Sequence, residues 1–189
     1  MDFLTIDDLK KKAKRTTPKA FHDYLTSGSW SESTLRKNSE DFDKITFKQR
    51  VAVDISNRST STKILGTNYA MPVALAPVGL LGMQRADGEI LAAQAAERHG
   101  VPFTLSTMSI CSIEEVAKKT TKPFWFQLYV MKDHDFAKRL VKRAKAAGCS
   151  ALVLTLDLQI LGQRHADIRN GLSIPIKVKM SNIADLLSK

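Results

Sequence analysis

Polar or backbone-exposing residues follow four consecutive apolar segments that have the length and composition of buried strands. They are Pro77-Val78-Gly79, Ser106-Thr107, Gln127 with Tyr129, and Thr155 with Asp157, and the loop after the last segment carries Arg164. Parallel α/β folds bind their ligands at the C-terminal ends of strands. We therefore expect these residues to meet at one end of a sheet.

The residue types in this set suit a flat heteroaromatic ring and a small carboxylic acid. A ring with amide edges needs backbone N–H and C=O groups close by, together with side-chain amides and hydroxyls. Arg164 offers a planar fork for a carboxylate, and the hydroxyl of Tyr129 can orient a substrate hydroxyl. Each residue alone is equally compatible with a turn, a helix cap or a satisfied backbone group. Their succession is what indicates a site.

From residue 71 onward, short apolar segments alternate with amphipathic ones. The expected strands are residues 73–76, 101–105, 123–130 and 151–156, and the expected helices are 87–99, a helix starting at Ser112, and 133–147. Strands that are almost wholly apolar indicate burial on both faces and hence a parallel sheet. The periodicity is compatible with a doubly wound sheet and with a barrel. No Gly-x-Gly-x-x-Gly follows a strand, which disfavours a dinucleotide-binding fold.

The first part of the chain reads as helical. Helices are expected after Thr5, from Thr17-Pro18 with the proline as first helical residue, and over 33–42, followed by a polar loop at 56–63. We divide the chain into a helical extension with a lead-in loop, 1–70, and a domain of about four strands, 71–189. A last short helix is expected at 181–187.

Composition is that of a globular protein, with 43% hydrophobic and 25% charged residues and a formal net charge of +10. No apolar run is long enough to span a membrane. The basic run at 10–15 indicates either a solvated helix face or contact with anionic lipid, and nothing indicates nucleic acid. Cys111 and Cys149 have no metal-ligand spacing, so we expect a cytoplasmic protein, either free or peripheral at the inner face of the cytoplasmic membrane.

An ordered set of short motifs along nearly the whole chain resembles the FMN-dependent 2-hydroxy-acid oxidases and dehydrogenases, the family of glycolate oxidase and flavin-type L-lactate dehydrogenase. The motifs lie at residues 23–28, 34–38, 76–79, 87–89, 102–107, 124–129, 154–157, 161–164 and 167–171. The segment 157–165 is most similar to bacterial flavin-type L-lactate dehydrogenases. The resemblance implies the first half of a (β/α)8 barrel with an N-terminal helical extension.

The resemblance also implies FMN as cofactor and the oxidation of a small L-2-hydroxy acid, with L-lactate to pyruvate favoured. The implied flavin contacts are Pro77, Val78, Gly79, Ser106, Gln127, Tyr129 and Thr155, and the implied substrate contacts are Tyr24, Tyr129 and Arg164. Asp157 corresponds to an acid that orients a catalytic histidine. We expect Ser106, Gln127, Tyr129 and Arg164 to converge around one flavin-sized hollow. The family's electron acceptor is a quinone, a cytochrome or oxygen.

A complete barrel of this kind needs eight strands and typically about 250 residues. The family's flavin-binding lysine, histidine base, second substrate arginine and glycine-rich phosphate site have no counterpart in this sequence. The four histidines are expected to be structural or exposed, and His165 would need Asp157 to orient it. No metal site is indicated.

If the chain is a half barrel, we expect it to exist in one of three states. It is one part of a split enzyme with a complementary C-terminal half, a self-associated half-barrel dimer, or a truncated product. The alternative function is a non-catalytic remnant that binds FMN or a partner half. Open strand edges in a half barrel would favour association, because they carry unpaired backbone groups.

Overall fold

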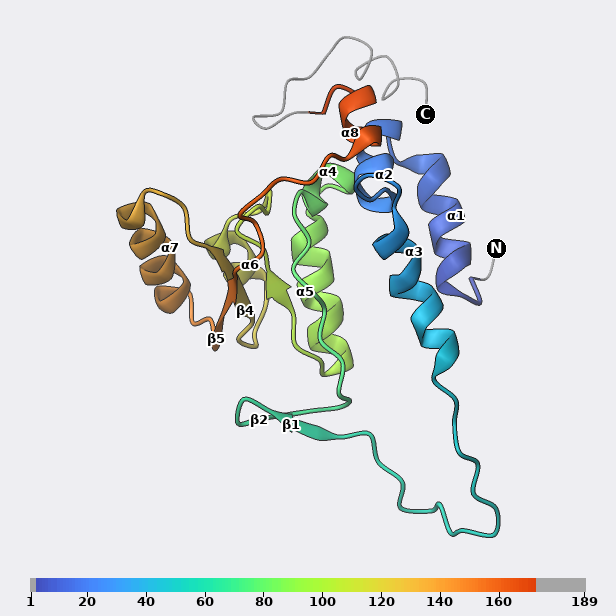
Figure 1. Cartoon of the computed structure of the whole chain (residues 1–189). Coiled ribbons are helices and arrows are strands. Elements are labelled where there is room, and N and C mark those ends of the chain that lie inside the picture. Colours follow the sequence, from blue (N-terminus) through green and yellow to red (C-terminus); the bar gives the residue numbers. More distant parts are fainter. Residues whose placement is uncertain (1–2, 173–189) are drawn as a thin grey trace. The chain divides into compact units, whose positions relative to one another are not determined.

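The computed structural model describes residues 3–172 (Figure 1). The helix expected at 181–187 lies outside these residues. The chain divides into two compact units, of which the first combines the residues up to Val53 with those from Ile160 onward and the second is Asp54–Gln159. The domain boundary at residue 70 stays a prediction.

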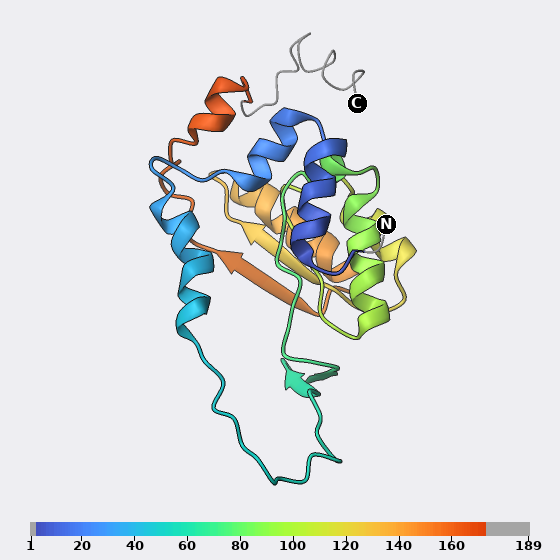
Figure 2. The ribbon, with the colours of Figure 1, turned by 90° about the vertical axis from the view of Figure 1, so that its right-hand side faces the viewer.

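The second unit is built on a three-stranded parallel sheet of β3 (Thr104–Leu105), β4 (Trp125–Tyr129) and β5 (Ala151–Thr155), in that order. The two long strands, drawn as yellow and orange arrows, run in the same direction (Figure 2). The strand expected at 73–76 is wrong, because only Leu75 forms a parallel bridge, with Phe103. Val73 N–H instead donates to Met71 within a turn, and Pro77 has no N–H to continue the ladder.

Helices follow the strands of this unit, and local capping explains where they begin and end. They are α4 (Leu81–Gln84), α5 (Gly88–His99), α6 (Ile113–Lys119) and α7 (His134–Ala146). Ser112 and Glu115 form a capping box at the start of α6, and Asp133 accepts from Phe136 N–H at the start of α7. Gly100 ends α5 with a φ of 65°. The expected helices are therefore confirmed to within a residue at these ends.

The hydrophobic core of the second unit lies between α5, α6, α7 and one face of the sheet. Its most buried large side chains include Leu105, Val116 and Phe126. Burial of all strands on both faces was expected, and it is wrong for β5, where Leu152 is 48% and Leu154 is 50% exposed. Among the described residues, α7 packs on β4, and β5 is the edge strand of the sheet with no further strand beside it.

A hairpin precedes the parallel sheet in the same unit. Its strands are β1 (Thr62–Ile64) and β2 (Thr67–Tyr69), which pair antiparallel. The two residues between them, Leu65 and Gly66, have φ values of 48° and 82°, which a two-residue hairpin turn of the primed type requires. The loop expected at 56–63 is therefore wrong at its end, where β1 begins.

The first unit contains α1 (Ile6–Thr16), α2 (Lys19–Thr26), α3 (Ser33–Glu40), a 3-10 turn η1 (Asp41–Lys44) and α8 (His165–Arg169). Thr5 and Asp8 form the capping box of α1. Pro18 is the N-cap of α2, so this helix begins one residue later than expected. The sequence patterns did not indicate α8, which packs against α2. Within the described residues no helix combines the length and apolarity that crossing a membrane requires.

Candidate functional site

Gln127 connects the C-terminal ends of the three parallel strands. Its side chain is 1% exposed. Its Oε1 accepts hydrogen bonds from Ser106 Oγ at 3.2 Å and from the backbone N–H of Thr107 at 3.1 Å. Its Nε2 donates to Thr155 Oγ1 at 2.8 Å. The structure thus brings together three of the residues that the resemblance assigned to the cofactor, Ser106, Gln127 and Thr155, and their contact with a flavin stays a prediction.

Thr107 adds a second connection between the same strand ends. Its hydroxyl donates to the Gln127 backbone carbonyl at 2.6 Å and accepts from Tyr129 N–H at 3.2 Å. Sequence reasoning placed Thr107 at a strand end and gave it no role in the site. The available signal was a hydroxyl that can donate and accept at once, next to Ser106. The backbone of Tyr129 therefore belongs to the same network as Ser106 and Gln127.

Some donor hydrogens of this network have no protein acceptor among the described residues. Gln127 Nε2 has two hydrogens, and within the described residues one of them is donated, to Thr155. The Thr155 hydroxyl accepts this bond, and in the part of the chain that the structure describes it donates its own hydrogen to no other group. Ser106 Oγ donates to Gln127 and accepts from Met108 N–H at 3.0 Å. Donors of this kind fit the carbonyl oxygens and ring nitrogens on the polar edge of a flavin.

The segment 77–79 runs along the loop that follows β3. It is held on one side by the bridge of Leu75 to Phe103 and on the other by Leu80 N–H, which donates to the Met108 carbonyl at 2.9 Å. Val78 is 38% exposed. In the described part of the chain, the backbone N–H groups of Val78 and Gly79 donate to no other group. These two groups are therefore left without a protein acceptor in that part of the chain, and their contact with a flavin stays a prediction.

Tyr24 and Arg164 lie together in the first unit. The Arg164 guanidinium is 5.0 Å from the centre of the Tyr24 ring, and it donates to the Tyr24 carbonyl and to the Asp167 carboxylate. Sequence reasoning missed Asp167, which is buried, because its burial depends on α8. Nε and Nη2 make these bonds, and no described residue accepts from Nη1. The third predicted substrate residue, Tyr129, belongs to the other unit.

Asp157 and two of the histidines, His22 and His165, lie at the following places in the structure. Asp157 is exposed, two residues beyond the end of β5. His165 is the first residue of α8, and its ring lies edge-on to Trp30 with ring centres 5.9 Å apart. His22 lies in α2, with Nδ1 3.5 Å from Thr26 Oγ1. Among the described residues, no cluster of three or more His, Cys, Asp or Glu side chains could hold a metal ion.

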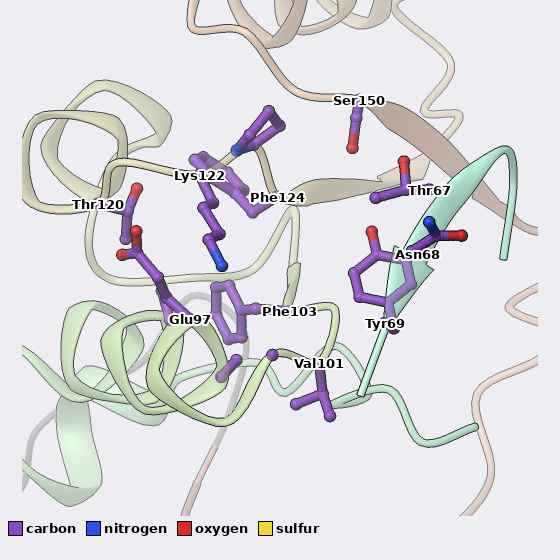
Figure 3. A pocket seen from close by; sticks show the side chains of 14 residues that line it. Thr67, Asn68, Tyr69, Glu97, Val101, Phe103, Thr120, Lys122, Phe124 and Ser150 are labelled. Carbon is purple, nitrogen blue, oxygen red and sulfur yellow. The ribbon is translucent and has the colours of Figure 1, made fainter. Parts of the chain in front are cut away.

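A cavity of about 260 Å³ lies at the opposite, N-terminal end of the sheet (Figure 3). Its walls come from β2, α5 and the residues just before β3, β4 and β5, among them Tyr69, Phe103, Phe124 and Ser150. Lys122 extends toward the Phe103 ring in this cavity. None of the predicted site residues lines it. The expected hollow around Ser106, Gln127, Tyr129 and Arg164 therefore stays a prediction.

Comparison with known proteins gives consistent matches. A family model described as FMN-dependent dehydrogenase matches residues 13–189. An L-lactate dehydrogenase of Haemophilus influenzae (strain PittEE) is 49% identical over 170 residues, which are 90% of this chain and 45% of that protein. One of Vibrio parahaemolyticus is 47% identical over 168 residues, 89% of this chain and 44% of the relative.

A crystal structure of the monotopic membrane protein (S)-mandelate dehydrogenase superposes with a TM-score of 0.90 at 34% identity. The match covers 98% of this chain and 49% of that one. The expected fold, the first half of a (β/α)8 barrel with an N-terminal helical extension, is confirmed. The chain spans slightly less than half the length of the proteins that it matches.

Proposed function

Because this chain belongs to the family of FMN-dependent dehydrogenases, we propose that it supplies flavin-edge and substrate residues for the oxidation of a small L-2-hydroxy acid, with L-lactate to pyruvate the favoured reaction. The observation that carries this proposal is the bonding of Gln127 to Ser106 and Thr155 at the C-terminal ends of adjacent parallel strands. That end of such a sheet is where barrel enzymes place their chemistry.

In this proposal the strand ends hold the cofactor by its polar edge. The remaining hydrogens of Gln127 Nε2 and Thr155 Oγ1 donate to ring acceptors, and the open backbone of 77–79 lies against the ring. Ser106 and Thr107 keep the Gln127 amide in one orientation. When bound, FMN supplies the two-electron acceptor for oxidation at the substrate α-carbon.

Tyr24, Tyr129 and Arg164 face the substrate in this proposal. The Nη1 group of Arg164 is the donor left for a substrate carboxylate, since Nε and Nη2 bind Asp167 and the Tyr24 carbonyl. Asp157 orients a histidine base that comes from the second half of a barrel. Removal of the α-proton and direct hydride transfer are both compatible with these roles.

The preference for lactate and the need for a complementary half rest on the relatives. Those with about half-identical sequence are named L-lactate dehydrogenase and are more than twice as long as the matched region. We therefore propose that a C-terminal half, carrying the histidine base and the phosphate site, completes the enzyme.

The test combines the purified chain, FMN and a polypeptide that carries the remaining half of the Haemophilus influenzae relative. We expect L-lactate, added without oxygen, to bleach the visible flavin absorbance only when both polypeptides are present. D-lactate is the matched control for the substrate. A mixture that forms a complex, binds FMN and leaves the flavin oxidised with L-lactate would contradict the catalytic role.

A second candidate is a non-catalytic chain that binds FMN or a partner half, and it is favoured by the edge of β5, which pairs with no further strand among residues 3–172. Leu152 and Leu154 are about half exposed beside that unpaired edge. Analytical ultracentrifugation of the chain alone, of Leu154→Lys and of the mixture distinguishes the cases. Association that Leu154→Lys abolishes, without flavin reduction in the mixture, would favour this candidate.

We also propose peripheral contact with anionic lipid through the basic run of α1. Support comes from the exposure of this run and of Ile6, at 79%, on one short helix. Co-sedimentation with phosphatidylglycerol vesicles, against phosphatidylcholine vesicles, tests it. We expect binding to the anionic vesicles alone, and a weakening with added salt, because screening acts on exposed charges. Equal binding to both would contradict the proposal.

A further inference from the structure

Glu89 is an ionisable side chain almost fully removed from solvent, at 1% exposed. It lies in the first turn of α5, in a motif that sequence reasoning used only as a mark of the family. A charged group so deeply buried needs hydrogen-bond partners to offset the loss of water. The partners of Glu89 come from two connecting loops: 77–84, which includes the one-turn helix α4, and 106–111.

One carboxylate oxygen joins these loops. Glu89 Oε1 accepts from Gly82 N–H at 3.0 Å and from Ile110 N–H at 2.9 Å. Gly82 lies in α4, directly after the proposed flavin-facing backbone at 77–79. Ile110 lies in the loop that begins at Ser106 and follows β3. The carboxylate therefore spans two segments that each carry proposed cofactor contacts.

The backbone around the carboxylate is packed too closely for larger residues. A Cβ atom at Gly82 would lie 2.6 Å from Ile110 Cβ and 3.0 Å from Glu89 Oε2. A Cβ atom at Gly88 would lie 2.8 Å from the Leu81 carbonyl oxygen. Glycine at both positions lets the two loops and α5 approach one another at Glu89. A third link, Leu80 N–H to the Met108 carbonyl, joins the same two loops.

The electrostatics agree with a charged carboxylate at this position. Burial acts to raise the pKa of Glu89, but the hydrogen bonds to its carboxylate, of which those from Ile110 and Gly82 are the largest, together hold the pKa below its usual value. Burial, with the hydrogen bond and charge of Glu89, raises the pKa of the neighbouring Cys111 thiol to about 11. Glu89 is thus an anion with a neutral thiol beside it.

We propose that Glu89 is a positioning residue that holds segment 77–84 against loop 106–111 and so sets the spacing between the 77–79 backbone and Ser106. That Glu89 holds the two loops together does not depend on the function proposed above. The expected effect on FMN binding does depend on it. Glu89 touches neither cofactor nor substrate in this proposal.

The test is hydrogen exchange of the whole chain, followed by mass spectrometry, for the wild type, Glu89→Gln and Glu89→Asp. Gln keeps an Oε1 acceptor at the same place but not the charge, so we expect both loops to exchange more slowly than in Glu89→Asp and somewhat faster than in the wild type. Asp keeps the charge but is one methylene shorter and cannot reach both N–H groups. Because a hydrogen bond to a charged group contributes about 1.5–3 kcal/mol, we expect exchange at least about ten-fold faster in both loops of Glu89→Asp. Glu97→Asp is the matched control, because Glu97 is half-buried on the same helix and bonds Thr121, so shortening it should leave both loops unchanged.

The fluorescence of FMN gives a second readout. We expect Glu89→Asp to weaken FMN binding more than Glu89→Gln does, because Gln retains the Oε1 acceptor. Unchanged exchange in Glu89→Asp, faster exchange in one loop only, or equal loss of protection in β4 would each overturn the proposal. If both loops loosen but the wild type binds no FMN, the positioning stands and the proposed function fails.

Discussion

The side-chain amide of Gln127 donates from Nε2 to the hydroxyl of Thr155 over 2.8 Å, while its Oε1 accepts from the segment that follows β3. One buried side chain therefore connects all three strands at the end where their backbone ladder stops. This matters most for β3, which has only two residues in the ladder. The side-chain bonds hold the strand ends where backbone bonds do not.

Replacing Gln127 with Met, which has a similar volume and no hydrogen-bonding amide, removes the side-chain partner of the Ser106 hydroxyl, the Thr107 backbone N–H and the Thr155 hydroxyl. We expect a loss of about 2–3 kcal/mol in the free energy of unfolding, because buried polar groups left unpaired are costly. Urea denaturation measures it. Gln94→Met is the control, since that side chain makes a single bond, to the Lys119 carbonyl. Equal losses in both variants would contradict the network.

Thr107→Val removes a hydroxyl and keeps the shape of the side chain. The Gln127 carbonyl and Tyr129 N–H then lose their shared partner, and we expect a loss of about 1–2 kcal/mol in stability. Thr107→Ser retains the hydroxyl and should lose less. A Val variant as stable as the Ser variant in the same denaturation experiment would count against the bridge.

Arg164→Lys tests the ordering of α8. Lysine cannot donate to the Asp167 carboxylate and the Tyr24 carbonyl through a planar fork, and Asp167 is buried. We expect amide exchange in α2 and α8 to become about ten-fold faster, the equivalent of one lost charged hydrogen bond. Arg169→Lys, exposed on the same helix, should leave exchange unchanged. The same effect from both variants would show that Arg164 has no special part.

The ion pair of Glu114 and Arg143 predicts a pH dependence. The two-pronged bond from Arg143 lowers the pKa of Glu114 from 4.5 to about 2. A carboxyl with a lowered pKa stabilises the fold fully above its unfolded value, and the contribution is lost as pH falls through 4.5 toward 2. Both side chains are nearly half exposed, so screening limits the contribution to about 1 kcal/mol or less.

Glu114→Gln removes this contribution, so the difference in unfolding free energy from the wild type should shrink with acidification and with added salt. Urea denaturation above and below the ordinary carboxyl pKa measures it. A difference that grows on acidification would have the wrong sign.

Local chemistry made most helix ends predictable. Thr5, Ser112 and Asp133 cap helices through residues within three positions, and Gly100 ends α5 through its own backbone angle. Local sequence could not predict whether residues 73–76 form a strand, because a strand forms only where a neighbouring strand continues the backbone hydrogen bonds. The α8 helix is too short for its sequence to show a helical pattern, and it packs against α2.

The candidate site likewise contains residues that the sequence predicts and residues that it does not. Ser106, Gln127 and Thr155 could be predicted because each follows or ends an apolar strand, and parallel strands end at a common edge. Thr107 was placed at a strand end, but its bridging role and the roles of Glu89 and Asp167 were not predicted, since such residues acquire their roles only when loops distant in sequence enclose them. Their burial cannot be inferred from neighbours in the chain.

The amino-acid sequence by itself determined the alternation of strands and helices, the helix caps and the set of polar residues at the strand ends, because these depend on contacts within a few residues. Only the tertiary structure decided that Gln127 joins three strands, that Glu89 joins two loops and that one face of β5 stays open. These three features depend on how close segments far apart in the chain come to one another. The packing of the helices on the sheet sets that distance.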